Sequence, residues 1–391
     1  MATGQYLSEV AVRLVERGHQ VTVLTSRRAY DDPRTLFPRH ETWRGIAIHR
    51  VGSTGWGKGA KWKRAADFAS FLASCCGRLA FLPRPDAVVA LTSPPLISFI
   101  GAWLARWRRA RFLYWVMDLN PDEAIAAGWL RPNSFLARLL ERGSRFSLRQ
   151  AVKIIALDRF MVERISAKGV ASAKIAVIPP WSQDDDVRFD WAGRERFRRA
   201  HGLNNRFVVM HAGNHSPCHP LDTLLEAAFR LRDDTDIAFC FVGGGSRFAS
   251  VQQFADQHRL RNMVCLPYQP LDELAGTLSA ADMHVVVMGD AFVGVVHPCK
   301  VYNILRVGTP ILYIGPPRSH VSEIVAELPG RHLYRSVQHG DVDGVMEHIR
   351  RVRVLGGERQ AERVQTTSQR YSKEALLARL IAEVEGQSAT G

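Results

Sequence analysis

The chain has 391 residues, too long for one ordinary hydrophobic core and suited to two α/β domains. Apolar residues make up 46% of it, which excludes a disordered chain, and no apolar run reaches the roughly 18–20 residues of a membrane span. The net charge of +14 is uneven, because residues 1–181 carry +15 and residues 182–391 carry −1. This asymmetry predicts a polyanionic partner for the N-terminal half, either a membrane leaflet or nucleic acid.

The six cysteines show no CxxC pair and no regular spacing. We therefore expect reduced thiols in a cytosolic protein rather than a disulfide framework. No signal peptide opens the chain, so any membrane contact is expected to be peripheral.

Residues 5–17 have helical apolar spacing, Gly18 stops the helix, and residues 20–25 follow as a strand. A doubly wound domain normally opens with a strand and a Gly-rich turn before such a helix. Neither precedes residue 5, so the sequence predicts that this first strand is missing.

A basic, tryptophan-containing segment, residues 55–64, leads into a helix over 65–82, and residues 103–111 repeat the same chemistry. Basic side chains and tryptophans beside an apolar helix are typical of an element that lies in a membrane interface. The alternative is a solvated helix face whose tryptophans pack on the sheet. The candidate membrane-facing residues are Trp56, Lys58, Lys61, Trp62, Lys63, Arg64, Arg106, Arg108 and Arg109.

Buried parallel strands are predicted at 87–91, 111–117 and 154–157. Asp118 follows the second of them, at the edge where α/β ligand sites lie, so its carboxylate is a catalytic or substrate-orienting candidate. Alternatively Asp118 only caps the following helix, and Asp122 or Glu123 could share its role.

The predicted domain boundary lies in residues 175–186, a strand end followed by prolines and acidic residues. Beyond it, strands at 207–213, 237–242, 263–266, 283–288 and 311–314 alternate with helices, which indicates a second parallel sheet. Residues 372–385 form a final amphipathic helix.

Residues 213–220 join a strand to a helix, and Gly243 opens a Gly-Gly-Gly turn after the next strand. That turn is not a dinucleotide fingerprint, because position 248 is Phe248 rather than glycine. A zinc site is the alternative for the first loop, since His211, His215, Cys218 and His219 are all ligand types, but their spacing matches no common finger.

Residues 288–315 predict an anion site, with a loop at Gly294, a helix from about Pro298, a stop at Gly308 and a strand over 310–314. Helix first-turn amides carry unpaired N–H groups and the positive end of the macrodipole. Lys300 lies in that first turn, where a neighbouring anion would stabilise it. The alternative is an ordinary surface lysine.

The same segment resembles the donor-site segment of the retaining family 4 glycosyltransferases, which have the GT-B fold. The matching elements are Gly294, Pro298-Cys299-Lys300 and Gly308-Thr309-Pro310-Ile311. The resemblance implies an α/β protein of two Rossmann-like parallel-sheet domains facing a central cleft. The family's two glutamates would fall on Val295 and Asn303, so both carboxylates are absent, although the amide oxygen of Asn303 could accept hydrogen bonds from the donor ribose.

The resemblance also assigns residues in other loops. An Arg and a Lys that grip the donor diphosphate in the family would fall on Asn214 and His219. Stabilisation of the leaving diphosphate would then rest on Lys300, helix N-termini and a protonated histidine. Asp118 would face the cleft as the catalytic residue. The resulting donor-binding candidates are Gly213, Asn214, His219, Gly243, Tyr268, Gln269, Gly294, Val295, Lys300 and Asn303.

We therefore expect an acceptor- and membrane-facing domain at 1–181, a nucleotide-sugar domain at 182–365 and a helix within 366–391 that packs back on the first domain. The expected activity is transfer of a sugar from a nucleoside diphosphate to a lipid-linked acceptor, in polysaccharide biosynthesis, at the inner face of the cell membrane. No metal, cofactor or nucleic-acid partner is expected. The alternatives are a non-catalytic membrane-docked binding protein and a nucleotide-sugar epimerase. The donor base, sugar, acceptor, linkage and oligomeric state are not specified by the sequence.

Overall fold

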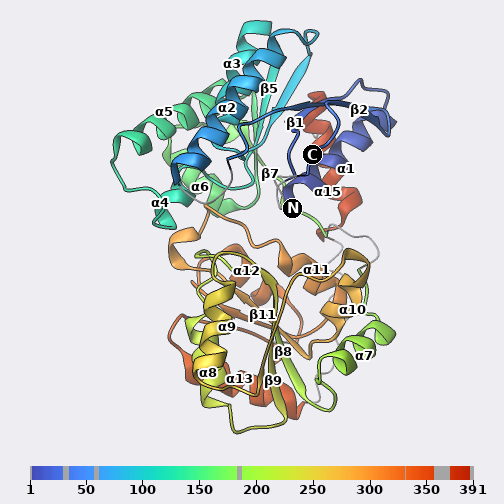
Figure 1. The fold of residues 1–391 in the computed structure, drawn as a ribbon, viewed down its shortest axis with the longest axis vertical. Coiled ribbons are helices and arrows are strands. Elements are labelled where there is room, and N and C mark those ends of the chain that lie inside the picture. The colour runs from blue at the N-terminus through green and yellow to red at the C-terminus, as the bar shows by residue number, and fades with distance from the viewer. Residues whose placement is uncertain are drawn as a thin grey trace. The chain divides into compact units, whose positions relative to one another are not determined.

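The structure, a computed structural model, describes residues 2–29, 35–56, 61–182, 187–330, 332–355 and 370–387. The chain divides into two compact units. Unit 1 holds Met1–Leu157, Met161–Ile178 and Leu376–Gly391, and unit 2 holds Asp158–Phe160 and Pro179–Ala375. Each unit contains parallel strands flanked by helices (Figure 1).

Unit 1 is built on two sheets. The smaller has the order β1-β3-β2, with β1 and β3 parallel and β2 antiparallel, and the larger is parallel with the order β4-β5-β6-β7. Strand β2 was not predicted, because three of its four side chains are exposed and it has no apolar run. The strands are β1 (Thr22–Ser26), β2 (His40–Trp43), β3 (Ile46–Val51), β4 (Ala87–Ala90), β5 (Arg111–Trp115), β6 (Lys153–Ala156) and β7 (Ile175–Val177).

The helices of unit 1 include the last helix of the described chain. Figure 1 shows α15 lying beside α1, and the Nε atom of Arg17 donates to Oε1 of Glu385 at 2.7 Å. The guanidinium of Arg111 also donates to the carbonyl oxygen of Val384 at 2.9 Å. The helices are α1 (Ala2–Glu16), α2 (Lys61–Ala80), α3 (Ile97–Arg108), α4 (Asp122–Ala126), α5 (Phe135–Gln150), α6 (Arg159–Ala167), η1 (Ser172–Lys174) and α15 (Lys373–Glu385).

Unit 2 contains one six-stranded parallel sheet with the order β10-β9-β8-β11-β12-β13. Its first strand in the sequence, β8, is central. The chain adds β9 and β10 on one side of β8, and then returns to add β11, β12 and β13 on the other. The strands are β8 (Phe207–Asn214), β9 (Ile237–Gly244), β10 (Met263–Leu266), β11 (Met283–Val287), β12 (Ile311–Ile314) and β13 (Tyr334–Val337).

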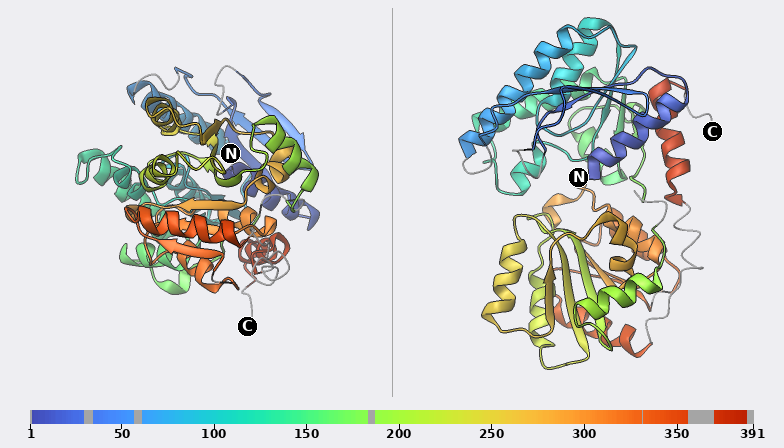
Figure 2. Two further views of the ribbon diagram at one scale, coloured as in Figure 1. Left: turned by 90° about the horizontal axis from the view of Figure 1, so that it is seen from below. Right: turned by 45° about the vertical axis from the view of Figure 1, so that its right-hand side comes forward.

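Both faces of this sheet are buried, as expected for a parallel sheet covered by helices (Figure 2). Successive side chains of β8 point to opposite faces of the sheet. Val209 packs in the hydrophobic cluster on one face, and Val208 and Met210 pack in the cluster on the other. The helices of unit 2 are α7 (Trp191–Ala200), α8 (Asp222–Arg230), α9 (Phe248–Gln257), η2 (Leu271–Glu273), α10 (Leu274–Ser279), η3 (Asp290–Phe292), α11 (Lys300–Val307), α12 (His320–Glu327) and α13 (Val342–Val354).

Candidate functional site

The strand order of unit 2 reverses between β8 and β11. Ligands of open α/β sheets bind outside the carboxyl ends of the strands at such a switch point. Here β8 and β11 pair through Met283 with Val209 and through His284 with Met210. Beyond these pairs, two imidazoles contact the carbonyl groups of β11.

His211 and His219 make these contacts. The Nδ1 atom of His211 lies 3.0 Å from the carbonyl oxygen of Val285, and that of His219 lies 2.6 Å from the carbonyl oxygen of Val287. Because a carbonyl only accepts, Nδ1 carries the proton in both rings. The Nε2 atom of each neutral ring is then an acceptor.

Lys300 lies against this pair of histidines. Its Nζ atom is 3.1 Å from Nε2 of His211, so the lysine donates and the imidazole accepts. Lys300 is half-buried, and burial lowers its pKa to about 7. An anion entering the switch point would restore the charged form of this amine.

The surrounding histidines are neutral near pH 7. Burial, with the charge of Lys300 as a further cause, lowers the pKa of His211 well below its ordinary value, that of His215 to about 4 and that of His219 to about 3. Burial also lowers the pKa of His284 to about 4. The expected protonated histidine is therefore wrong, because a cationic imidazole here would be desolvated and beside an ammonium group.

Two glycines bring the ends of β8 and β9 close together. Gly213 pairs with Gly243, and a Cβ atom on Gly243 would lie 2.0 Å from the carbonyl oxygen of Gly213. A Cβ atom on Gly213 would lie 3.2 Å from Nζ of Lys300. Glycine at 213 therefore keeps the approach to the Lys300 amine open, and glycine at 243 lets the two strand ends lie close together.

The remaining predicted donor residues lie around these strand ends. Asn214 is exposed at the end of β8, and Tyr268 is 61% exposed. The Tyr268 ring lies near Gly244, where an added Cβ atom would come within 3.0 Å of it. The side chain of Gln269 donates to the carbonyl oxygen of Pro267 at 2.9 Å, which holds it within its own loop.

The predicted loop and helix at 288–315 are present, with a later helix start. Gly294 has a positive φ of 68°, and α11 ends at Gly308, whose φ is 73°. The helix starts at Lys300 with Cys299 as its N-cap, two residues after Pro298. Lys300 is thus the first residue of α11, and Cys299 makes no side-chain capping hydrogen bond.

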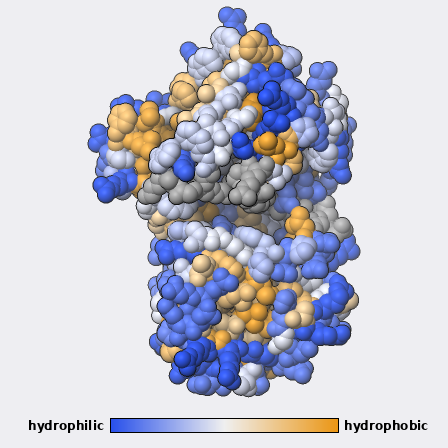
Figure 3. Space-filling model, viewed as in Figure 1, coloured by the Kyte–Doolittle hydropathy of each residue, from blue (hydrophilic) through white to orange (hydrophobic). Residues whose placement is uncertain are grey.

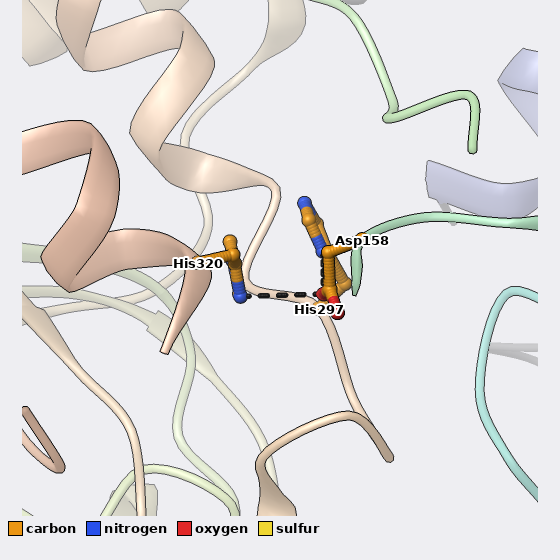
Figure 4. A group of neighbouring side chains, drawn as sticks. All are labelled: Asp158, His297 and His320. Carbon is orange, nitrogen blue, oxygen red and sulfur yellow. Dashed lines mark hydrogen bonds and ion pairs between the residues drawn. The ribbon is translucent and has the colours of Figure 1, made fainter. Parts of the chain in front are cut away.

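A buried polar cluster next to this helix was not predicted. Nδ1 of His297 lies 2.7 Å from Oδ2 of Asp158, and Nε2 of His297 lies 2.7 Å from the hydroxyl oxygen of Tyr302. His320 stacks on His297 with ring centroids 3.7 Å apart, and its Nδ1 lies 3.4 Å from the same Asp158 oxygen (Figure 4). Asp158 directly follows a predicted strand end, as Asp118 does, which is the signal that could have drawn attention to it.

Ligand-type side chains of the described residues also converge at this cluster, not in the loop where the sequence raised zinc. The ligand atoms of Asp158, His297 and His320 lie within 4.8 Å of one another. In the 211–219 loop, by contrast, the ring nitrogens of His211 and His219 are engaged by carbonyl groups of β11.

A cavity of about 350 Å³ lies elsewhere on unit 2. Asp222 and Glu226 supply two carboxylates to its lining, which would repel a diphosphate. We therefore place no donor phosphate there. Its lining residues are Pro220, Asp222, Thr223, Glu226, His339, Gly340 and Val342.

Asp118 lies in unit 1, after β5. Its backbone N–H donates to Oγ1 of Thr92 at 3.3 Å, and burial, with the nearby charge of Glu123, raises the pKa of its carboxyl to about 7. The N-cap of α4 is Pro121, without a side-chain capping hydrogen bond, so the alternative that Asp118 caps this helix is wrong. Thr92 and Asn120 line a pocket of about 50 Å³ at this edge.

Comparisons with known proteins show a similarity to glycosyltransferases. Residues 2–181 match the family described as the Glycosyl transferase 4-like domain. WcaI of Escherichia coli K12, named as a colanic acid biosynthesis glycosyl transferase, is 26% identical over 404 residues, which cover 98% of this chain and 96% of the relative. The chain is therefore similar to family 4 glycosyltransferases. WbjE of Pseudomonas aeruginosa, named as a glycosyltransferase, is 24% identical over 244 residues, which cover 62% of this chain and 61% of the relative.

Solved structures support the GT-B fold of this chain. HepE from Anabaena, in complex with UDP and glucose, aligns with a TM-score of 0.72 at 14% identity, covering 98% of this chain and 96% of that one. WaaG, a glycosyltransferase involved in lipopolysaccharide biosynthesis, aligns with a TM-score of 0.68 at 14% identity, covering 98% and 95%. The expected fold of two parallel-sheet α/β domains is confirmed.

The two positions at which the resembled family has glutamates carry no carboxylate in this chain. Val295 is buried, with 1% of its surface exposed. The amide oxygen of Asn303 accepts a hydrogen bond of 2.6 Å from the hydroxyl of Ser182. An amide oxygen has two lone pairs, so this hydrogen bond occupies one of them.

The predicted membrane-facing tryptophans of this chain are exposed. Trp56 and Trp62 are 54% and 61% exposed and contact each other edge to face. Trp107, 54% exposed, lies under the Arg108 guanidinium at 4.4 Å. The alternative that these rings pack on the sheet is wrong for them. Lys58 lies outside the described residues, as do the side chains of Lys61 and Arg64.

An apolar surface near α5 was missed by the sequence analysis. Phe135 is 83% exposed, and Leu136 and Trp129 are 52% and 58% exposed. Figure 3 shows apolar residues gathered over this end of unit 1. Within the described parts of the chain, none of the helices combines the length and the apolar content needed to cross a bilayer.

Proposed function

We propose that this protein is a glycosyltransferase that moves a sugar from a nucleoside-diphosphate donor to a lipid-linked acceptor during polysaccharide assembly, with retention of configuration at the anomeric carbon. The observation that carries the proposal is the half-buried amine of Lys300 beneath the glycine-lined switch point of unit 2. Such a site suits a diphosphate, because glycines let phosphate oxygens approach and the amine supplies charge.

The donor class is supported by relatives. HepE was crystallised with UDP and, in another structure with a TM-score of 0.66, with UDP-glucose. In this chain Gly213, Gly243 and Lys300 lie around the switch point where a GT-B donor diphosphate would bind. We propose that Tyr268, which is exposed beside Gly244, contacts the donor base.

The leaving group determines the chemistry. Cleavage of the bond between the anomeric carbon and the diphosphate oxygen leaves negative charge on that oxygen, and the Lys300 ammonium stabilises it. No metal is required for that charge in this proposal. The acceptor hydroxyl oxygen forms the new bond to the anomeric carbon, and its proton passes to the leaving diphosphate oxygen. Asp118 orients the hydroxyl or stabilises developing positive charge on the sugar.

The acceptor class follows from the surface of unit 1. Trp56, Trp62 and Trp107 are exposed beside basic residues, the composition of an element that binds anionic lipid headgroups. We propose that this face docks on the inner face of the cell membrane, where a lipid-linked acceptor would be available. The polysaccharide role is supported by WcaI and WaaG, whose names place them in colanic acid and lipopolysaccharide biosynthesis.

A non-catalytic binding protein is the second candidate, favoured by the missing carboxylates at Val295 and Asn303. The transferase and the non-catalytic binding protein are distinguished by incubating the purified protein with radiolabelled nucleotide sugars and bacterial membrane extract. Label entering the lipid fraction, and lost in Lys300→Met, supports the transferase. Binding of a nucleotide sugar without any transfer would favour the non-catalytic protein, and NMR of the product linkage tests retention.

A further inference from the structure

The start of helix α11 is supported by a side-chain link that is not a capping hydrogen bond. Its N-cap, Cys299, makes no side-chain capping hydrogen bond, although an N-cap side chain commonly binds the backbone N–H three residues later. His297, two residues before the N-cap, is instead linked to Tyr302, in the first turn of α11, at 2.7 Å. This side-chain link spans the four residues 298–301, which include Lys300.

His297 is held on several sides. Asp158 accepts from Nδ1 at 2.7 Å, and His320 stacks on the ring face at 3.7 Å between centroids. His320 is itself fixed, because α12 opens with a capping box at Ser319 and Ser322. Only 5% of His297 is exposed. These contacts fix the orientation of the His297 imidazole, and they therefore restrict the backbone between His297 and Tyr302.

The geometry is that of a hydrogen-bonded chain rather than of a metal centre. The rings of His297 and His320 are stacked with an interplanar angle of 15°. An ion bound by Nδ1 of both rings would lie out of both ring planes, whereas a histidine ligand normally holds its metal in the ring plane. The carboxylate of Asp158, accepting at 2.7 Å from His297, satisfies the network directly.

We propose that the Asp158–His297–Tyr302 chain fixes the first turn of α11 and thereby holds the Lys300 amine against His211 at the switch point. Asp158 and His297 are then positioning residues of the donor site. Only the consequence for diphosphate binding rests on the proposed function, because the effect on Lys300 itself does not require a ligand.

The direct readout is the titration of Lys300, followed by NMR of protein labelled with ¹³C at lysine Cε and assigned with Lys300→Arg. Lys300 faces the neutral imidazoles of His211, His215, His219 and His284, which belong to β8, the following loop and β11. With the Asp158–His297–Tyr302 hydrogen bonds intact, burial lowers the pKa of Lys300 to about 7. If α11 shifts, the amine gains water and its pKa rises toward the ordinary lysine value.

Three substitutions and one control test the role of the hydrogen-bonded network of Asp158, His297 and Tyr302. His297→Ala is expected to raise the Lys300 midpoint by at least about one pH unit, and Tyr302→Phe, which keeps the ring, by a smaller amount. His297→Asn retains a donor near the Nδ1 position and is expected to restore most of the wild-type midpoint. The matched control is His348→Ala, which removes another fully buried imidazole, on α13, and should leave the midpoint unchanged.

Several outcomes would overturn the proposal. They are an unchanged Lys300 midpoint in a folded His297→Ala protein, an equal shift in His348→Ala, or an ordinary lysine midpoint in the wild type. Zinc bound at one ion per chain and lost in His320→Ala would show a metal site instead. Calorimetry with UDP separates the two ideas, because a wild-type chain that does not bind UDP argues against this donor while the Lys300 titration still decides the positioning role.

Discussion

Lys300 and its surroundings set the expected pH response of donor binding. The pKa of Lys300 is lowered to about 7, and those of His215, His219 and His284 lie at about 4, 3 and 4. Between pH 7 and 9 Lys300 therefore loses its charge while these histidines stay neutral. A bound diphosphate favours the ammonium form, so binding must take up a proton when the pH is above 7.

The affinity for UDP is accordingly expected to fall as pH rises from 7 to 9, by at most about tenfold per unit. Calorimetry in two buffers of different ionisation enthalpy should show net proton uptake at pH 8. Lys300→Arg is the matched control, because its guanidinium stays charged throughout and its profile should be flat. An equally steep wild-type and Lys300→Arg profile would assign the titration to another group.

Asp118 is the corresponding residue of unit 1. Its pKa is raised to about 7, so the carboxylate is present above pH 7 and is protonated as the pH falls below it. We expect Asp118→Asn to abolish transfer while UDP affinity stays within about twofold of wild type. Activity should also decline from pH 7 to pH 5. A variant that keeps most of its transfer rate would remove Asp118 from the reaction.

At the scale of elements, the sequence predicted what depends on local chemistry. The end of α11 was predicted at Gly308, because glycine favours the left-handed C-cap conformation, and a strand was predicted after it. Both predictions are confirmed. The start of α11 was placed two residues early, because the support that replaces a capping side chain comes from His297 and Tyr302. Asp158, which completes that support, is 139 residues from His297, a separation that no local pattern bridges.

The close approach of β8 and β9 gives an element-scale prediction. Gly243→Ala would place a Cβ atom 2.0 Å from the Gly213 carbonyl oxygen, so the strand ends must separate and UDP binding should be lost. Gly202→Ala is the control, since Gly202 also has a positive φ, of 64°, but its Cβ atom meets nothing within 4 Å. The control should cost about 1 kcal/mol of unfolding free energy and keep UDP affinity.

If Gly243→Ala binds UDP as the control does, with a similar loss in the free energy of unfolding, the close approach has no role in the donor site. The free energies should be measured by urea titration and the affinities by calorimetry on the same preparations.

At the scale of the whole molecule, the positive charge lies in residues 1–181, and exposed tryptophans lie with it. Each basic residue near an anionic surface contributes on the order of 1 kcal/mol. We therefore expect binding to phosphatidylserine-containing vesicles that weakens as salt rises, and its loss when Lys63, Arg106 and Arg109 are changed to Glu. Tryptophan emission should shift to the blue on binding.

Phe135 and Leu136, exposed at the start of α5, supply a separate variant, in which both are changed to Ser. If this variant loses vesicle binding while the charge-reversed variant still binds as the wild type does, the membrane contact lies at α5 instead. Equal binding of the wild type to neutral and anionic vesicles would contradict the electrostatic account.

The most direct test of the central claim is titration of the wild-type chain and Lys300→Met with UDP at pH 7, with GDP, ADP and TDP as further probes. The account predicts that the wild type binds one nucleoside diphosphate and that the variant binds it about 10- to 100-fold more weakly, the loss of one charge-assisted contact. The melting temperature of Lys300→Met should be unchanged or higher, because the variant buries no amine. Equal affinity of the two proteins, or no binding of any nucleoside diphosphate by the wild type, would contradict it.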